Sequence, residues 1–221
     1  MGPRPIDANL NRLIMELSGL WKDPQDPARI EKILQALDTR YGLIRKMAQE
    51  PEVQEIIEQM FGRLAHSYGR LSDLQDQRIL DIACGSNTSK LPASHYVNTP
   101  FGEATFGRAG RGFTALFEPW FCRILYELGA TPVGIDFGDL EHELFIHHQV
   151  DLGKPGALDF LSDHSFDGIQ DSRLFGSPEF ADQFPDPADR LTVAREINRQ
   201  ENRLLKIDGI IIHSDAAELL K

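Results

Sequence analysis

Cysteine is scarce in this chain of 221 residues, which contains Cys84 and Cys122 and no other. Two cysteines are too few for the disulfide framework that small secreted domains need. The first residues, Met-Gly-Pro-Arg-Pro-Ile-Asp, lack the apolar run of a signal peptide. No stretch approaches the ~20 apolar residues that span a bilayer. These absences favour a reduced, cytoplasmic protein without a membrane segment.

Basic residues are also few, because 23 Lys and Arg stand against 34 Asp and Glu, for a formal net charge of −11. A phosphate backbone would be repelled by this charge, so we expect no nucleic-acid partner. Hydrophobic residues make up 41% and charged residues 26%, as in an ordinary globular protein. The length predicts one main domain with an appendage.

The first 74 residues are predicted to form an all-helical cap. Apolar residues recur there at three- and four-residue spacing. The expected helices are Ala8–Leu20 and two amphipathic helices within Pro27–Ser72, divided at Pro51, which suits a first helical turn. Their apolar faces can pack onto the rest of the chain or form a homodimer.

From residue 75 to 221, short apolar runs alternate with helical segments, which predicts an α/β domain with a mostly parallel sheet. The expected strands are Arg78–Ala83, Pro132–Asp136, Phe145–Val150, Phe166–Gln170 and Gly209–His213. The expected helices are Pro119–Leu128, Ala157–Leu161 and Asp186–Leu205.

A turn of small residues follows the first predicted strand. Gly85 has no Cβ, and Ala83, Cys84 and Ser86 are small, so a ligand can approach the backbone. Ligands of open α/β sheets bind at the carboxyl ends of the strands, where the strand order reverses. At the next two strand ends, Asp136 can accept hydrogen bonds from ribose hydroxyls, and Asp151 can accept them from an exocyclic amine.

Five segments, in order and spacing, resemble the motifs of class I S-adenosylmethionine-dependent methyltransferases. They are Leu80–Ser86, Val133–Asp136, Val150–Leu152, Phe166–Asp171 and Leu204–Asp215. The resemblance implies a Rossmann-like three-layer sandwich and S-adenosyl-L-methionine as cofactor. The cofactor-binding residues that follow from it are Asp81, Ala83, Cys84, Gly85, Ser86, Asp136, Phe137, Asp151, Leu152 and Gln170.

The chain departs from that family in three places. Asn87 stands where the first motif usually carries another Gly, and Asp81 and Asp136 lie 55 positions apart. The excess is a loop, residues 87–117, which we interpret as an insertion. The chain ends at Lys221, so we expect a sheet shortened at its C-terminus, or one whose exposed edge is covered by the N-terminal helices.

The inserted loop carries Arg108 and Arg111 among glycines and aromatic residues. One interpretation is a lid whose arginines hold an anionic substrate. The alternative is a surface loop whose arginines are solvated.

Methyl transfer from a sulfonium is an in-line displacement, so the protein mainly positions the reactants and removes a proton. We predict Asp171, after the fourth strand, as the base, with Glu179 and His213 as more remote candidates. Adenine-specific nucleic-acid enzymes of that family carry an Asn/Asp-Pro-Pro-aromatic motif where this chain has Gln170-Asp-Ser-Arg173. Together with the acidic charge, this favours a small-molecule or protein acceptor, and of the two we expect a small molecule. The alternative function is a non-catalytic S-adenosylmethionine-binding or protein-interaction module.

No metal site is predicted. Neighbouring His147 and His148 would point to opposite faces of a strand, so the histidine cluster that includes His142 cannot form one coordination sphere. Cys84 and Cys122 are interpreted as packing residues.

Overall fold

The N-terminal region is all-helical, as predicted. The computed structural model describes residues 8–23, 26–85, 115–138, 140, 142–172, 174–175, 180 and 183–221. Its first helices are α1 (Ala8–Ser18), α2 (Asp26–Tyr41), α3 (Leu43–Gln49) and α4 (Pro51–Tyr68). Pro51 occupies the first turn of α4, and Gly69, with a φ of 77°, ends that helix.

The break between α2 and α3 was not predicted from the sequence. Gly42 adopts a left-handed φ of 68°, which interrupts the helix. The carboxylate of Asp38 accepts the backbone N–H of Ile44 at 2.9 Å and so stabilises the start of α3. The apolar spacing continues on both sides of Gly42, which explains why one helix was expected.

Five parallel strands form one sheet, and each lies where a strand was expected. They are β1 (Arg78–Ile82), β2 (Thr131–Asp136), β3 (Ile146–Gln149), β4 (Phe166–Asp171) and β5 (Leu205–Ser214). The order across the sheet is β3-β2-β1-β4-β5. The chain therefore has an α/β fold with an all-parallel sheet.

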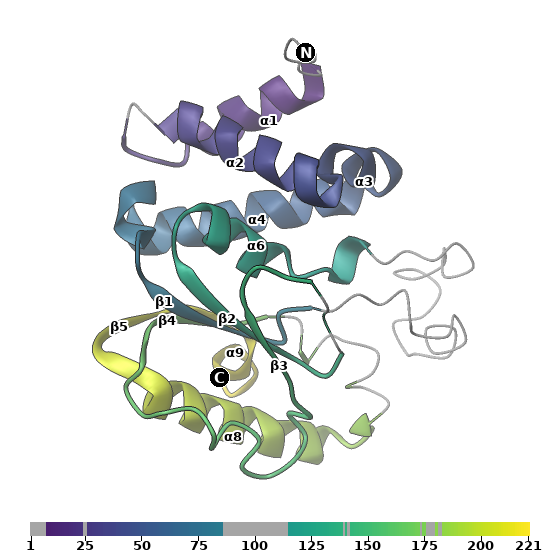
Figure 1. The fold of residues 1–221 in the computed structure, drawn as a ribbon. Coiled ribbons are helices and arrows are strands. Elements are labelled where there is room, and N and C mark those ends of the chain that lie inside the picture. The colour runs from purple at the N-terminus through teal and green to yellow at the C-terminus, as the bar shows by residue number, and fades with distance from the viewer. Residues whose placement is uncertain are drawn as a thin grey trace.

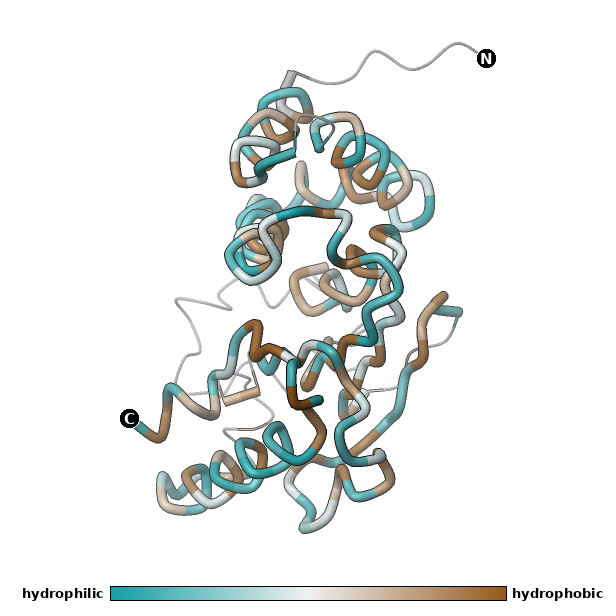
Figure 2. The backbone as a smooth tube through the Cα atoms, turned by 90° about the vertical axis from the view of Figure 1, so that its left-hand side faces the viewer, coloured by the Kyte–Doolittle hydropathy of each residue, from teal (hydrophilic) through white to brown (hydrophobic). Residues whose placement is uncertain are grey.

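Helices cover both faces of this sheet (Figure 1). α6 (Trp120–Glu127) connects β1 to β2 and lies on the same face as α4, whereas α8 (Pro187–Leu204) covers the other face. α1, α2 and α3 form a further layer on α4 and α6. Short elements complete the described fold: η1 (Leu71–Leu74), η5 (Ala115–Phe117) and α9 (Asp215–Leu219). Figure 2 shows the helices alternating between hydrophobic and hydrophilic residues, the amphipathic pattern that such a layered packing needs.

The short helix predicted at Ala157–Leu161 is wrong, because this segment forms successive turns. Gly156 has a left-handed φ of 71° at its start. Arg203 of α8 donates hydrogen bonds to the carbonyl oxygens of Leu158 and Leu161, each at 2.9 Å. The side chain of Arg203 thus occupies acceptors that a continued helix would have used.

Two hydrophobic cores lie on the two faces of the sheet. The first joins the buried sides of α1, α2 and α4 to α6, and to Ile79 and Ile212 of the sheet. The second joins Leu80 and Ile82 to α8. Side chains alternate across β1, so Asp81 faces the same side as Ile79. The N-terminal helices therefore share their core with the α/β region.

A buried ion-pair network joins the helical layers to the segment before β3. Glu118 accepts hydrogen bonds from Lys46 of α3, at 2.5 Å, and from Arg123 of α6. Arg123 also pairs with Glu143 at 2.6 Å, and its guanidinium lies over the ring of Tyr41. Within the described residues, no helix has the length and hydropathy of a transmembrane span.

Candidate functional site

The strand order reverses between β1 and β4. From β1 the chain proceeds outward to β2 and β3, and then crosses back to β4 on the other side of β1. Loops leaving neighbouring strands in opposite directions open a crevice at the carboxyl ends of the strands, and ligands of open α/β sheets bind there. The predicted site residues follow β1, β2, β3 and β4 and therefore lie along this edge.

The turn after β1 is held by the carboxylate at the end of β2. Gly85, with a φ of 96°, donates its backbone N–H to Asp136 Oδ2 at 3.0 Å. Asp136 Oδ1 accepts the backbone N–H of Gly138 at 2.9 Å. Ala83 also adopts a positive φ of 60°, and Cys84 donates its backbone N–H to Ile135. The structure thus brings two of the main predicted residues, Gly85 and Asp136, into direct contact.

Gly85 cannot be replaced by a larger residue without a shift of the backbone. A Cβ on Gly85 would lie 2.2 Å from the carbonyl oxygen of Phe117, just before α6. The missing side chain therefore permits close packing between the turn and the start of the helix that connects β1 to β2, which is one of the roles of glycine in nucleotide-binding turns.

Asp151 and Phe137 follow the two adjacent strands β3 and β2. Asp151 Oδ1 accepts hydrogen bonds from the backbone N–H of Gly153, at 3.1 Å, and from Gln183 Nε2, at 3.3 Å. Phe137 is 61% exposed, so its ring is open to a ligand. Leu152 is instead buried in the core on the α8 face.

A buried polar group lies at the end of β1, next to the strand reversal. Asp81 is 1% exposed and accepts weak hydrogen bonds from Cys122 Sγ at 3.6 Å and Gln170 Nε2 at 3.5 Å. Burial raises the pKa of Asp81 to about 7, while the bonds from Cys122 and Gln170 oppose that rise. A substantial fraction of Asp81 is therefore protonated at neutral pH. Both cysteines are buried, as expected of packing residues.

Asp171 is buried beneath α9. Asp171 Oδ1 accepts the backbone N–H of Asp215 at 2.7 Å, and Oδ2 accepts the backbone N–H of Ala216 and the hydroxyl of Ser214. Burial raises the pKa of Asp171, and it raises that of neighbouring Glu201 to about 8. This geometry gives Asp171 an anchoring role for α9, and its role as a base stays a prediction.

Sequence reasoning missed Arg63, a cation that α4 brings to this edge. Burial lowers the pKa of Arg63, whereas the charges of Asp215, Asp81, Glu218 and Asp171 raise it. Its position was a usable signal, because Arg63 follows the buried Met60 by three residues and so belongs to the buried stripe of α4. The edge nevertheless carries more carboxylates than cations among the described residues, which favours a cationic ligand.

Several predicted residues lie outside the described residues: Ser86, Arg108, Arg111, Glu179 and the loop segment 87–114. His213 is described, and it lies beside Gln170 in the pairing of β4 with β5. Its Nε2 atom lies 2.7 Å from Asp215 Oδ1. Of the histidine cluster near β3, His148 packs edge-on against Phe160, with ring centroids 4.9 Å apart.

Comparisons of this chain with protein-family models, with curated proteins and with solved structures give no match.

Proposed function

We propose that this chain is an S-adenosylmethionine-dependent methyltransferase with a Rossmann-like fold that acts on a small-molecule acceptor. The observation that carries the proposal is the contact between Gly85 and Asp136 at the edge where the strand order reverses. A glycine turn after the first strand, held against an acid at the end of the second, is the arrangement that binds the ribose of a nucleoside cofactor.

The residues at this edge suit the chemistry of the cofactor. The carboxylate oxygens of Asp136 accept the backbone N–H groups of Gly85 and Gly138, and a carboxylate is also the acceptor that ribose hydroxyls need. The ring of Phe137 offers an apolar face to adenine. The surplus of carboxylates suits a ligand with a positive sulfonium and ammonium group.

Bound at this edge, S-adenosylmethionine would supply an activated methyl group. The chain's own residues would then hold the donor. Asp136 would bind the ribose and Asp151 the adenine amine, and the buried Asp81 and Gln170 would support the site from below, at the point where the strand order reverses. Positioning of this kind is the main contribution that an in-line displacement needs. A proton from a hydroxyl or amine acceptor would pass to Asp171.

Calorimetric titration of the full chain with S-adenosylmethionine tests the donor site. We expect Asp136→Asn to weaken binding about 10- to 100-fold, since charge-assisted hydrogen bonds contribute about 1.5–3 kcal/mol. Asp189→Asn, at an exposed position of α8, is the matched control and should leave binding unchanged. No binding to the wild-type chain, or equal binding by both variants, would refute the donor site.

A non-catalytic S-adenosylmethionine-binding module is the second candidate, and the engagement of both Asp171 oxygens with α9 favours it. Transfer of a radiolabelled methyl group to small molecules of a cell extract distinguishes the enzyme from the binding module. Homodimerisation through the N-terminal helices stays a prediction. Their buried stripes pack within the chain, and Met15 of α1 is a large apolar side chain left exposed.

A further inference from the structure

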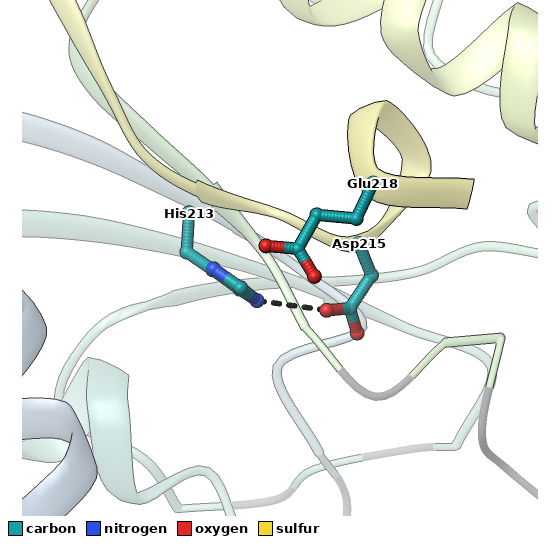
Figure 3. A group of neighbouring side chains, drawn as sticks. All are labelled: His213, Asp215 and Glu218. Carbon is teal, nitrogen blue, oxygen red and sulfur yellow. Dashed lines mark hydrogen bonds and ion pairs between the residues drawn. The ribbon is translucent and has the colours of Figure 1, made fainter. Parts of the chain in front are cut away.

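Three potential metal ligands meet where β5 ends and α9 begins. Figure 3 shows the side chains of His213, Asp215 and Glu218 turned toward one another. One imidazole nitrogen and one oxygen from each carboxylate all lie within 4.8 Å of one another, and His213 Nε2 lies 2.7 Å from Asp215 Oδ1. Asp215 and Glu218 are three residues apart on α9, so they project from the same side of the helix.

The surroundings of these residues are acidic. Asp171 is buried directly beneath the start of α9, where it accepts the backbone N–H of Asp215. Arg63 of α4 acts electrostatically on Asp215, Glu218 and Asp171. Carboxylates gathered in this way attract a cation.

A second observation comes from the neighbouring strand. Gln170, which pairs in register with His213, is fully buried, and its Oε1 atom has no hydrogen-bond partner within the part of the chain that the structure describes. A buried acceptor of this kind is costly unless a donor reaches it. Water bound to a metal ion is a strong donor, and polar residues next to metal ligands commonly accept such bonds.

We propose that His213, Asp215 and Glu218 bind one divalent transition-metal ion of the Mn²⁺ to Zn²⁺ series. A mixed imidazole and carboxylate set suits these ions, whereas Mg²⁺ and Ca²⁺ prefer oxygen ligands alone. With metal–ligand distances of about 2.0–2.2 Å, the ligand atoms would lie about 3.0–3.4 Å from one another. His213 Nε2 and Asp215 Oδ1, at 2.7 Å, would have to separate slightly, and the exposed Glu218 has room to adjust. Three protein ligands leave further coordination positions to water or substrate.

The ion would lie at the same edge of the sheet as the proposed cofactor turn, but its binding does not depend on methyl transfer. The experiment therefore measures metal uptake by the full chain, first treated with a chelator and dialysed. Co²⁺ is followed by its visible absorption, and Zn²⁺, Mn²⁺ and Mg²⁺ by calorimetry. We expect one equivalent of Co²⁺, Zn²⁺ or Mn²⁺ to bind, and Mg²⁺ to bind at least ~10-fold more weakly.

His213→Gln and Glu218→Gln should each weaken uptake at least ~10-fold. The matched controls, His66→Gln and Glu52→Gln, change exposed residues of α4 and should bind metal as the wild type does. Circular dichroism verifies that each variant folds. If His213→Gln does not fold, the metal uptake of Glu218→Gln alone tests the proposed site.

Three results would overturn the metal site: no saturable uptake by the wild type, uptake that Glu218→Gln leaves unchanged, or equal affinity for Mg²⁺. A parallel titration with S-adenosylmethionine keeps the two proposals separate, since loss of one binding event leaves the other measurable.

Discussion

Replacing Asp81 with asparagine removes a buried carboxyl group whose pKa burial raises from 3.8 to about 7. Between these two values the folded chain holds a proton that the unfolded chain has released, so the free energy of unfolding falls as pH rises. The span is about 3 pH units at about 1.4 kcal/mol each, which gives an upper limit of about 4 kcal/mol. The amide side chain of the Asp81→Asn variant stays neutral at every pH and avoids this loss.

Urea unfolding of the wild type and of Asp81→Asn at pH 4.5, 6, 7 and 8 measures the effect. The stability of the variant relative to the wild type should grow steadily with pH, toward about 4 kcal/mol at pH 8. Asp73→Asn, at an exposed position, should follow the wild type throughout. Asp81 is also a predicted cofactor residue, so the stabilised variant should bind S-adenosylmethionine more weakly. A difference in the free energy of unfolding that stays constant with pH would refute a desolvated carboxyl group at this position. So would a variant whose stability relative to the wild type falls above pH 7.

Three further substitutions probe the backbone and the buried charges, each measured by urea unfolding at pH 7. Gly85→Ala combines a positive φ of 96° with a contact of 2.2 Å and should cost at least about 2 kcal/mol, whereas Gly62→Ala, in an open helical position, should gain up to about 1 kcal/mol. Arg203→Lys should cost about 1–2 kcal/mol because it loses two bonds to backbone carbonyls. Arg199→Lys, at an exposed ion pair, should change stability by less than about 0.5 kcal/mol. Equal effects at the two arginines would show that the bonds from Arg203 to Leu158 and Leu161 do not stabilise the fold. Glu118→Gln removes the carboxylate that both Lys46 and Arg123 contact in a largely buried network, so that Arg123 keeps Glu143 as its carboxylate partner. It should cost about 3 kcal/mol, and a neutral result would show that this network is solvated.

Most of the strands were predictable because they carry short apolar runs, and a parallel sheet covered on both faces needs that composition. β3, with the sequence Ile-His-His-Gln, is the exception, since its residues are exposed or half-buried. The turns were harder. Ala157–Leu161 has a helical composition. However, Arg203, from much later in the chain, donates hydrogen bonds to the carbonyl oxygens of Leu158 and Leu161. The break at Gly42 depends on one left-handed residue within an unbroken apolar pattern. Non-local partners and single φ angles leave little trace in periodicity.

Part of the candidate site could likewise be predicted from the sequence, and part could not. The contact between Gly85 and Asp136 follows from strand order, since the ends of adjacent parallel strands lie side by side. The anchoring of α9 by Asp171 did not follow, because the partners are backbone N–H groups of residues 215 and 216. The meeting of His213, Asp215 and Glu218 required the chain to turn into α9 directly after β5, and that helix was not predicted.

The shared core of the N-terminal helices has a consequence for the order of synthesis. α4 leaves the ribosome early, yet the surface that it covers includes Ile212 of β5, the last strand of the described sheet. The apolar stripes of the early helices are therefore fully buried only after β5 has been synthesised. Contacts between residues far apart in the sequence are slow to form and leave intermediates open to aggregation. The N-terminal helices are thus expected to reach their final packing only once β5 has left the ribosome.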